Sequence, residues 1–336
     1  MIIQTEEEVV PWLKQRLAQS GVDSKVTLSD NGRILAEGKA HNPDQISISI
    51  NVFSQDAKYR GALSAALDSA LIRPTICQRH FDERYGYDEC PIRAIDGSQL
   101  GVFGSRDLAT LAKHLEVKDA AKIYLVHDTN FLYRRYGSLV FSHLSRADSR
   151  FEIRTPRLAV LEIEALTHRD TKKESGWKRR AALAAFGELL RLQDRGAQLL
   201  PDIPSELLRP FSDIAGKGWG DAWIRREIHD FAKKILGAPS QCVVFVTSDL
   251  ANALAAKAEG IWTLYLATTA DQNESINLDS VAFARLIVAL SVYLERVSFK
   301  TESPGKKEAY EIRGDWLGKT TLHWKDLAVV IDSSSF

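Results

Sequence analysis

The segment KIYLVHDTNFLY, residues 122–133, carries the first decisive pattern of this 336-residue chain. Residues 123–126 form an apolar run typical of a buried strand, and the polar sequence HDTN follows it directly. Asp128 at the end of such a strand is either a turn residue or part of a metal site. The pattern of the surrounding chain has to separate these two interpretations.

A second apolar strand, VVFVT at residues 243–247, follows a series of segments with helical periodicity. Thr155 and Pro156 are typical of a helix start after the short strand at RFEIR, and Gly260 is typical of a helix end. Helices are also predicted over residues 181–195 and 221–236. Unbroken apolar strands that alternate with helices predict an α/β fold with a parallel sheet covered on both faces.

Three segments are expected along the chain. Residues 1–118 are predicted to form an α+β domain, with an opening helix, a hairpin turn at Asn31–Gly32, a strand over residues 45–53 and a helix over residues 61–72. Residues 119–270 hold the strand–helix alternation. Residues 271–336 are expected to add an apolar helix, a polar connector (KTESPGKKE) and two short strands, TLHW and LAVVI.

Composition argues against a disordered or a collagen-like chain. The chain is 45% apolar, and its 44 basic residues balance 44 acidic ones. This is typical of a globular protein, and a local basic rim could still bind nucleic acid. Three scattered cysteines and an N-terminus without a signal-peptide pattern predict a cytoplasmic protein. The most apolar segment, residues 281–294, is interrupted by Arg285 and is too short for a membrane helix, so no membrane association is expected.

Four acids fall where a common site could form. Asp128 and Asp249 follow the ends of apolar strands, where α/β sheets bind ligands, and Glu162 and Asp221 lie on the apolar sides of predicted helices. Converging carboxylates repel one another unless a cation neutralises them, and an all-oxygen site suits Mg²⁺ or Mn²⁺. Such a site suits hydrolysis of phosphodiester bonds. Taken one at a time, however, Asp249 and Asp221 could be helix caps, Asp128 a turn residue and Glu162 a solvated side chain.

Four blocks of the sequence resemble the PIN-domain nucleases. In chain order they are DTNFL, PRLAVLEIEAL, GDAWI and VVFVTSDLANALAAKAEGI, which together span about residues 122–267. The resemblance implies a PIN-like, Rossmann-like three-layer domain and a metal-dependent endoribonuclease. Its catalytic and metal-binding acids would be Asp128, Glu162, Asp221 and Asp249.

The resemblance also implies residues that support the acids or contact the scissile phosphate. These are Thr129 or Asn130, Thr247 or Ser248, and Asn252. The chain departs from the family in two respects: residues 172–220 are longer than compact members need, and residues 1–118 and the tail lie outside the match.

Basic and aromatic residues indicate where RNA could be held. Arg134 and Arg135 follow the first acid, Trp219 precedes the third, and TKKESGWKRR places five basic residues around Trp177. Arginines could contact phosphates and a tryptophan could stack on a base, although charge runs are often only solvated helix ends. Cys77, His80 and Cys90 supply only three zinc ligands and are interpreted as structural.

Several alternatives stay open at this point. The chain could be a PIN-like scaffold that binds RNA or protein without cutting, a DNA-cleaving relative, or an α/β protein whose four acids are only caps. Residues 1–118 could position substrate or recruit a protein partner. The apolar helix at residues 281–294 could serve a homo-oligomer interface as well as a core.

Overall fold

The structure is a computed structural model of the chain. The described residues are 2–50, 61–63, 66–67, 122–133, 151–167, 176–201, 220–235, 241–261, 263–265, 276–316 and 327–334. The chain divides into two compact units, and each is described by itself. The first unit comprises Met1–Leu71, Arg169–Gly187 and Ala270–Phe336, and the second comprises Ile72–His168 and Glu188–Thr269.

The second unit contains a five-stranded sheet whose strand pairs are all parallel. Its strands are β5 (Lys122–His127), β6 (Phe151–Thr155), β7 (Gln198–Leu199), β8 (Gln241–Thr247) and β9 (Thr263–Tyr265), in the order β7-β6-β5-β8-β9. The predicted parallel sheet is therefore confirmed. Tyr124 and Val126 on one face of β5 and Ile123 and Leu125 on the other are all buried, as expected for a strand covered on both sides.

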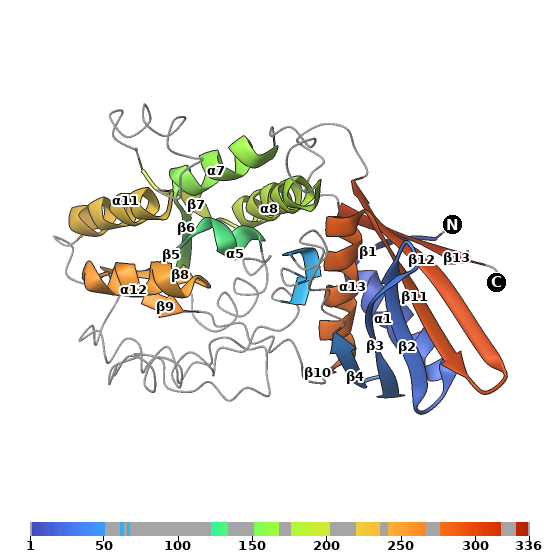
Figure 1. The fold of residues 1–336 in the computed structure, drawn as a ribbon. Coiled ribbons are helices and arrows are strands. Elements are labelled where there is room, and N and C mark those ends of the chain that lie inside the picture. Colours follow the sequence, from blue (N-terminus) through green and yellow to red (C-terminus); the bar gives the residue numbers. More distant parts are fainter. Residues whose placement is uncertain are drawn as a thin grey trace. The chain divides into compact units, whose positions relative to one another are not determined.

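Helices alternate with these strands (Figure 1). They are α5 (Thr129–Tyr133), α7 (Arg157–Thr167), α11 (Gly220–Ile235) and α12 (Leu250–Ala258), together with the end of α8 (Gly176–Asp194), whose residues up to Gly187 belong to the first unit. Ile224 and Ile228 of α11 share a core cluster with Leu158 of α7 and Phe245 of β8. Gly260 ends α12 in the left-handed region, with φ 76°, as its place in the sequence predicts.

The strand order places a topological switch point between β5 and β8. From β5 the chain proceeds to β6 and β7 on one side, and it later returns to β8 and β9 on the other. His127 pairs with Val246, and the amide of Asp128 donates to the carbonyl of Val246 at 3.3 Å, so the two strands end side by side. In sheets of this kind, ligands bind at such a point, beyond the carboxyl ends of the strands.

The first unit is built on an eight-stranded sheet of antiparallel pairs. Its strands are β1 (Ile2–Thr5), β2 (Ser24–Asp30), β3 (Arg33–Asn42), β4 (Gln45–Ile50), β10 (Ile276–Leu278), β11 (Arg296–Ser303), β12 (Lys306–Trp316) and β13 (Leu327–Ser334), in the order β1-β13-β12-β11-β2-β3-β4-β10. Helices α1 (Glu6–Ser20) and α13 (Ser280–Leu294) lie alongside the strands (Figure 1). Phe299 of β11 contacts Trp12 of α1 and Phe283 of α13, so both helices cover the same face.

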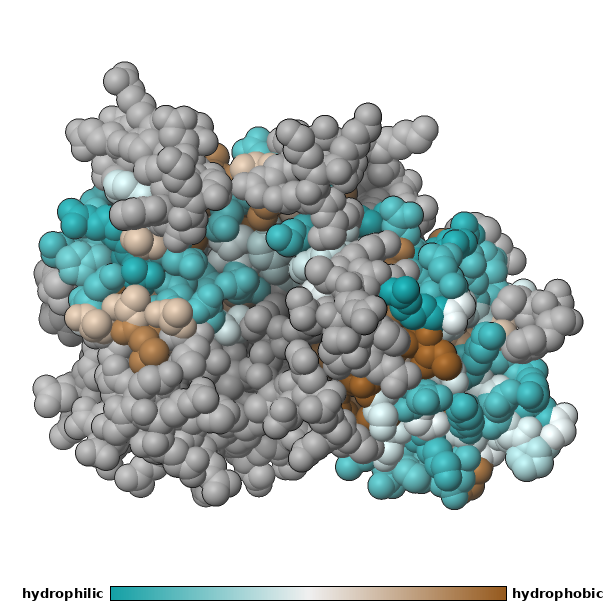
Figure 2. All heavy atoms as spheres, in the orientation of Figure 1, coloured by the Kyte–Doolittle hydropathy of each residue, from teal (hydrophilic) through white to brown (hydrophobic). Residues whose placement is uncertain are grey.

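The surface of this unit follows from that arrangement. On β11, Val297, Phe299 and Thr301 are buried and the intervening Lys300 is exposed. In Figure 2, mostly hydrophilic residues cover the strands of this unit at the lower right of the view. One face of the sheet is therefore a core face and the other is polar, as is common in antiparallel sheets.

Several local predictions for the first unit are confirmed. Asn31 and Gly32 have φ of 48° and 78° and join β2 to β3, as a type I′ turn requires. The predicted opening helix is α1, and LAVVI lies in β13. TLHW lies outside the described residues, as does most of the expected helix over residues 61–72.

One prediction for the tail is wrong. The segment KTESPGKKE is not a connector, because it forms the ends of β11 and β12 and the turn between them. Pairing of β2 with β11 and of β1 with β13 also joins residues 2–50 and residues 276–334 in one sheet, where the sequence suggested two separate segments. Nearly all side chains of α13 are buried within the chain, so this helix contributes to the core. Among the described residues, no helix combines the length and apolar character needed to span a membrane.

Candidate functional site

Asp128 occupies the end of β5 at the switch point and is fully buried. Its Oδ1 accepts a hydrogen bond of 3.1 Å from the amide of Phe131 and so caps the short helix α5. Its Oδ2 accepts from the hydroxyl of Thr247 at the end of β8. Asp128 therefore caps a helix, where the sequence suggested a turn residue, but capping accounts for only one of its two carboxylate oxygens.

Asn252 of α12 links two of the four acids. Its Nδ2 lies 3.4 Å from Oδ2 of Asp128 and 3.3 Å from Oδ1 of Asp221 in the first turn of α11. Its backbone amide donates to Oδ1 of Asp249 at 3.1 Å, so Asp249 caps α12. The buried side chain of Asn252 thus joins Asp128 and Asp221, which stand 93 residues apart in the chain. Asp249 lies at the start of the helix that carries Asn252.

Arg225 fixes the orientation of this amide. Its Nη1 donates to Oδ1 of Asn252 at 2.7 Å, and its Nε lies 3.0 and 3.1 Å from the two carboxylate oxygens of Glu259. Because Oδ1 of Asn252 accepts from a guanidinium, the amide nitrogen must face Asp128 and Asp221. Sequence analysis did not identify Arg225, although its position four residues after Asp221 on a helix is a signal for contact.

The surroundings of Asp221 act on its carboxyl electrostatically. Burial raises the pKa of the Asp221 carboxyl above its ordinary value, the negative charge of Asp249 raises it further, and Arg225 partly offsets both effects. Both effects disfavour the ionised form of the Asp221 carboxyl relative to an exposed aspartate, and a nearby positive charge would favour it.

Glu162 approaches the other acids from α7. Its Oε2 accepts a hydrogen bond of 2.5 Å from the hydroxyl of Thr129, the residue after Asp128. The same oxygen lies 3.6 Å from the position that a Cβ at Gly220 would take, directly before Asp221. Glu164, two residues later, is exposed, as its position on the helix predicts. The four acids therefore come from β5, α7, α11 and the end of β8 and are linked through contacts at one edge of the sheet.

The remaining predicted site residues divide into two groups. Thr129 and Thr247 donate to the acids, as described above, while Asn130 is half-buried on α5 and Ser248 is buried between β8 and α12. Arg134, Arg135 and Trp219 lie outside the described residues, as do Cys77, His80 and Cys90.

Two buried titratable groups support the site without touching the acids' carboxylates. Glu227 of α11 accepts hydrogen bonds from the amides of Arg157 at 2.8 Å and Leu158 at 3.2 Å, the first turn of α7. Burial raises the pKa of Glu227 to about 7, and these two amides partly offset that effect. His127 stacks on Phe131, and burial lowers its pKa to about 4, so this residue contributes to packing beneath the site.

The donor set has the chemistry of a site for a hard cation. The four predicted side chains are all carboxylates, and the repulsion between Asp221 and Asp249 is what a divalent ion would relieve. Within the described parts of the chain, no three or more His, Cys, Asp or Glu side chains stand close enough to hold an ion as they lie. The Asn252 amide occupies the space between Asp128 and Asp221.

Comparison of the chain with models of known protein families, with curated proteins and with solved structures finds no match in any of the three.

Proposed function

We propose that the chain is a metal-dependent endoribonuclease with a PIN-like domain, which hydrolyses RNA phosphodiester bonds at Asp128, Glu162, Asp221 and Asp249. The observation that carries the proposal is the position of Asn252, whose amide nitrogen lies within hydrogen-bonding distance of both Asp128 and Asp221 at the β5–β8 switch point. Acids that served only as helix caps would have no reason to share a donor.

The acids would hold Mg²⁺ or Mn²⁺, directly or through water. When bound, such an ion lowers the pKa of a water molecule and neutralises charge on the phosphate oxygens. The residues of the chain provide the orientation: the hydroxyls of Thr247 and Thr129 hold Asp128 and Glu162, and Arg225 holds the amide of Asn252. Burial and the charge of Asp249 raise the pKa of Asp221, and a bound cation would offset both effects.

The test compares cleavage of labelled single-stranded RNA by the full chain and by Asp128→Asn, with Mn²⁺ and with a chelator. We expect the substitution to reduce Mn²⁺-dependent cleavage by roughly a hundredfold or more, since it removes a negative charge from the site. Asp230→Asn, on the same helix as Asp221 but paired with Arg226, is the matched control and should cleave like the parent. A thermal unfolding curve for each variant separates loss of fold from loss of chemistry.

Parallel digestion of single-stranded RNA, single-stranded DNA and a branched duplex identifies the nucleic acid. RNA cleavage that Asp128→Asn abolishes supports the proposal, and cleavage confined to DNA replaces it with a deoxyribonuclease at the same site. If no nucleic acid is cut with either ion, the inert scaffold that binds RNA or protein is the better description.

A further inference from the structure

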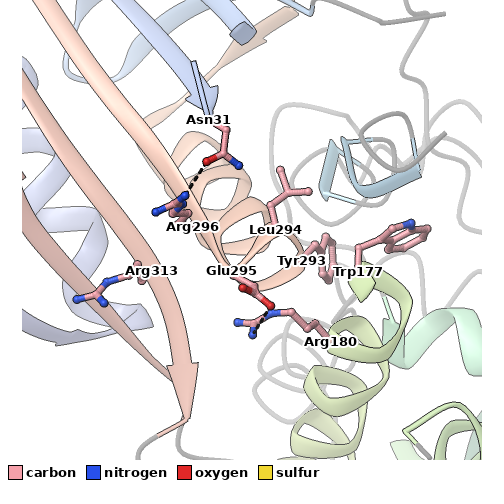
Figure 3. Close-up of a pocket in the computed structure, with 8 residues that line it drawn as sticks. All are labelled: Asn31, Trp177, Arg180, Tyr293, Leu294, Glu295, Arg296 and Arg313. Atoms are coloured by element: carbon pink, nitrogen blue, oxygen red, sulfur yellow. Dashed lines mark hydrogen bonds and ion pairs between the residues drawn. The ribbon is translucent and has the colours of Figure 1, made fainter. Parts of the chain in front are cut away.

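A polar cavity lies in the first unit, where α13 ends and α8 begins (Figure 3). Its volume is about 580 Å³, within the size range of small-molecule sites. Arginines and aromatic rings dominate its lining, which includes Trp177, Arg180, Tyr293, Glu295, Arg296 and Arg313. None of these residues belongs to the unit that holds the four acids.

Arg180 is held rigidly at this cavity. Its Nε donates to the carbonyl of Val292, and its Nη2 donates to the carbonyl of Gly314 at 2.7 Å. The approach depends on Gly314, because a Cβ there would lie 2.8 Å from Cγ2 of Val292. With two nitrogens anchored on carbonyls, the guanidinium presents Nη1 on the side of Glu295, 3.7 Å from its carboxylate. A guanidinium fixed in this way is preorganised for an anion.

Glu295 is a replaceable partner for Arg180. Its side chain is 75% exposed, so the ion pair is screened by water and contributes little. Its backbone has φ 75° and ψ −36°, a region that residues other than glycine rarely adopt. Strained residues of this kind concentrate at ligand sites.

Trp177 supplies an aromatic surface beside the arginines. Its ring packs edge-on against Tyr293, with the centroids 6.2 Å apart and the planes at 62°. Gly61 fixes the indole from another direction, because a Cβ there would lie 2.7 Å from Cζ2. Tyr293 is almost fully buried and Trp177 only half-buried, so the accessible aromatic surface is that of Trp177.

The remaining polar groups form the rim. Arg296 donates to Oδ1 of Asn31 at 2.6 Å and lies 3.8 Å from Glu311, while Arg313 contacts Asp332 at 2.8 Å. The side chains of Arg296 and Arg313 are 51% and 43% exposed. Both can therefore turn toward an anion at little cost, since exposed ion pairs are weak.

We propose that this cavity binds a nucleotide, with the base on Trp177 and the phosphate at Arg180 and Arg296. A fixed guanidinium, two adjustable ones and one aromatic face together match a ligand that carries both a planar ring and a negative charge. An acidic peptide would use the arginines but would leave Trp177 without a role. The ligand is either a free nucleotide or one unit of an RNA strand, because the chemistry is the same.

The test measures binding to the full chain by calorimetry in a chelating buffer, so that it does not depend on cleavage. The probes are AMP, ATP and a short single-stranded RNA. Arg296→Ala removes an exposed cation and is expected to weaken binding of each bound probe about tenfold, as is Trp177→Leu, which keeps an apolar side chain without a stacking face. Glu295→Asn removes the competing carboxylate and is expected to tighten binding several-fold. Lys39→Ala, an exposed residue of β3 outside the cavity, is the control and should bind like the parent.

Binding of AMP or ATP that changes as expected in these variants supports a site for a free nucleotide, and binding of the oligonucleotide alone supports a site for an RNA strand. The inference is overturned if none of the probes binds at millimolar concentration. It is also overturned if Arg296→Ala, Trp177→Leu and Glu295→Asn all bind like the Lys39→Ala control, since Arg180 would then serve only to cap α13. Neither result bears on the acids of the second unit.

Discussion

The guanidinium of Arg225 donates a hydrogen bond of 2.7 Å to the side-chain oxygen of Asn252. This contact turns the amide nitrogen of Asn252 toward Asp128 and Asp221, and Glu259 holds Arg225 in turn. Arg225 therefore acts through Asn252 as a positioning residue for two of the four acids.

Replacing Arg225 by alanine should lower metal-dependent RNA cleavage by about 10- to 100-fold, because the amide of Asn252 loses the partner that orients it. Arg226→Ala is the matched control, since Arg226 is exposed on the same helix and pairs only with Asp230 among the contacts described. Steady-state cleavage rates and melting temperatures for both variants make the comparison. Equal rates for the two variants would remove Arg225 from the site.

The buried carboxyl of Glu227 should make stability depend on pH. Its pKa is raised from 4.5 to about 7, so the unfolded chain loses this proton at a lower pH than the folded protein does. The free energy of unfolding is therefore expected to fall by up to about 3 kcal/mol as pH rises from about 4.5 to about 7. Above that range, Glu227 adds no further dependence on pH.

Urea unfolding of the parent and of Glu227→Gln across this range checks the expectation. The glutamine cannot ionise, so the difference in unfolding free energy between the two proteins should change with pH in the stated direction. Glu164→Gln, at an exposed position of α7, should follow the parent curve. Parallel curves for the parent and Glu227→Gln would contradict the assigned titration.

Binding of Mn²⁺ should strengthen as pH rises. Burial and the charge of Asp249 raise the pKa of Asp221, so as pH falls a proton competes with the ion for this carboxylate more strongly than it would for an exposed aspartate. The melting temperature is therefore expected to rise more with Mn²⁺ at about pH 7.5 than at about pH 5.5, and Asp221→Asn should lose most of this rise. A rise that is independent of pH, or retained in Asp221→Asn, would place the ion elsewhere.

Gly38 should be essential for the sheet of the first unit. A Cβ at this position would lie 1.9 Å from the carbonyl oxygen of Ser47 on the paired strand β4, so Gly38→Ala requires the backbone to shift. We expect a loss of about 3 kcal/mol or more in unfolding free energy. Ser49→Ala, at an exposed position of β4, should change the unfolding free energy by less than about 0.5 kcal/mol. If both variants lost the same free energy of unfolding, the close approach of position 38 to the Ser47 carbonyl would not limit stability.

Local patterns in the sequence predicted much of the second unit. The apolar runs before Asp128 and Asp249 indicated β5 and β8, and their lack of alternation indicated a sheet covered on both faces. The hairpin turn at Asn31–Gly32 could also be predicted from the sequence, because the positive φ angles it needs are favoured by these two residues themselves. These features depend on neighbours within a few positions, which the sequence lists directly.

Long-range pairing could not be read in the same way. The segment that joins β11 and β12 is polar, so the sequence indicated a connector where the two strands in fact pair. Pairing of β11 with β2 and of β12 with β13 brings strands from both ends of the chain into one sheet. The same reason applies to the site. The positions of the acids along the chain predicted which carboxylates would follow strands and which would lie on helices. Only the packing of α11 against α12 and β8 brings Arg225 to Asn252. The same packing places the amide of Asn252 between Asp128 and Asp221. Hydrogen bonds between side chains depend on distances that the whole fold sets, and no local pattern contains them.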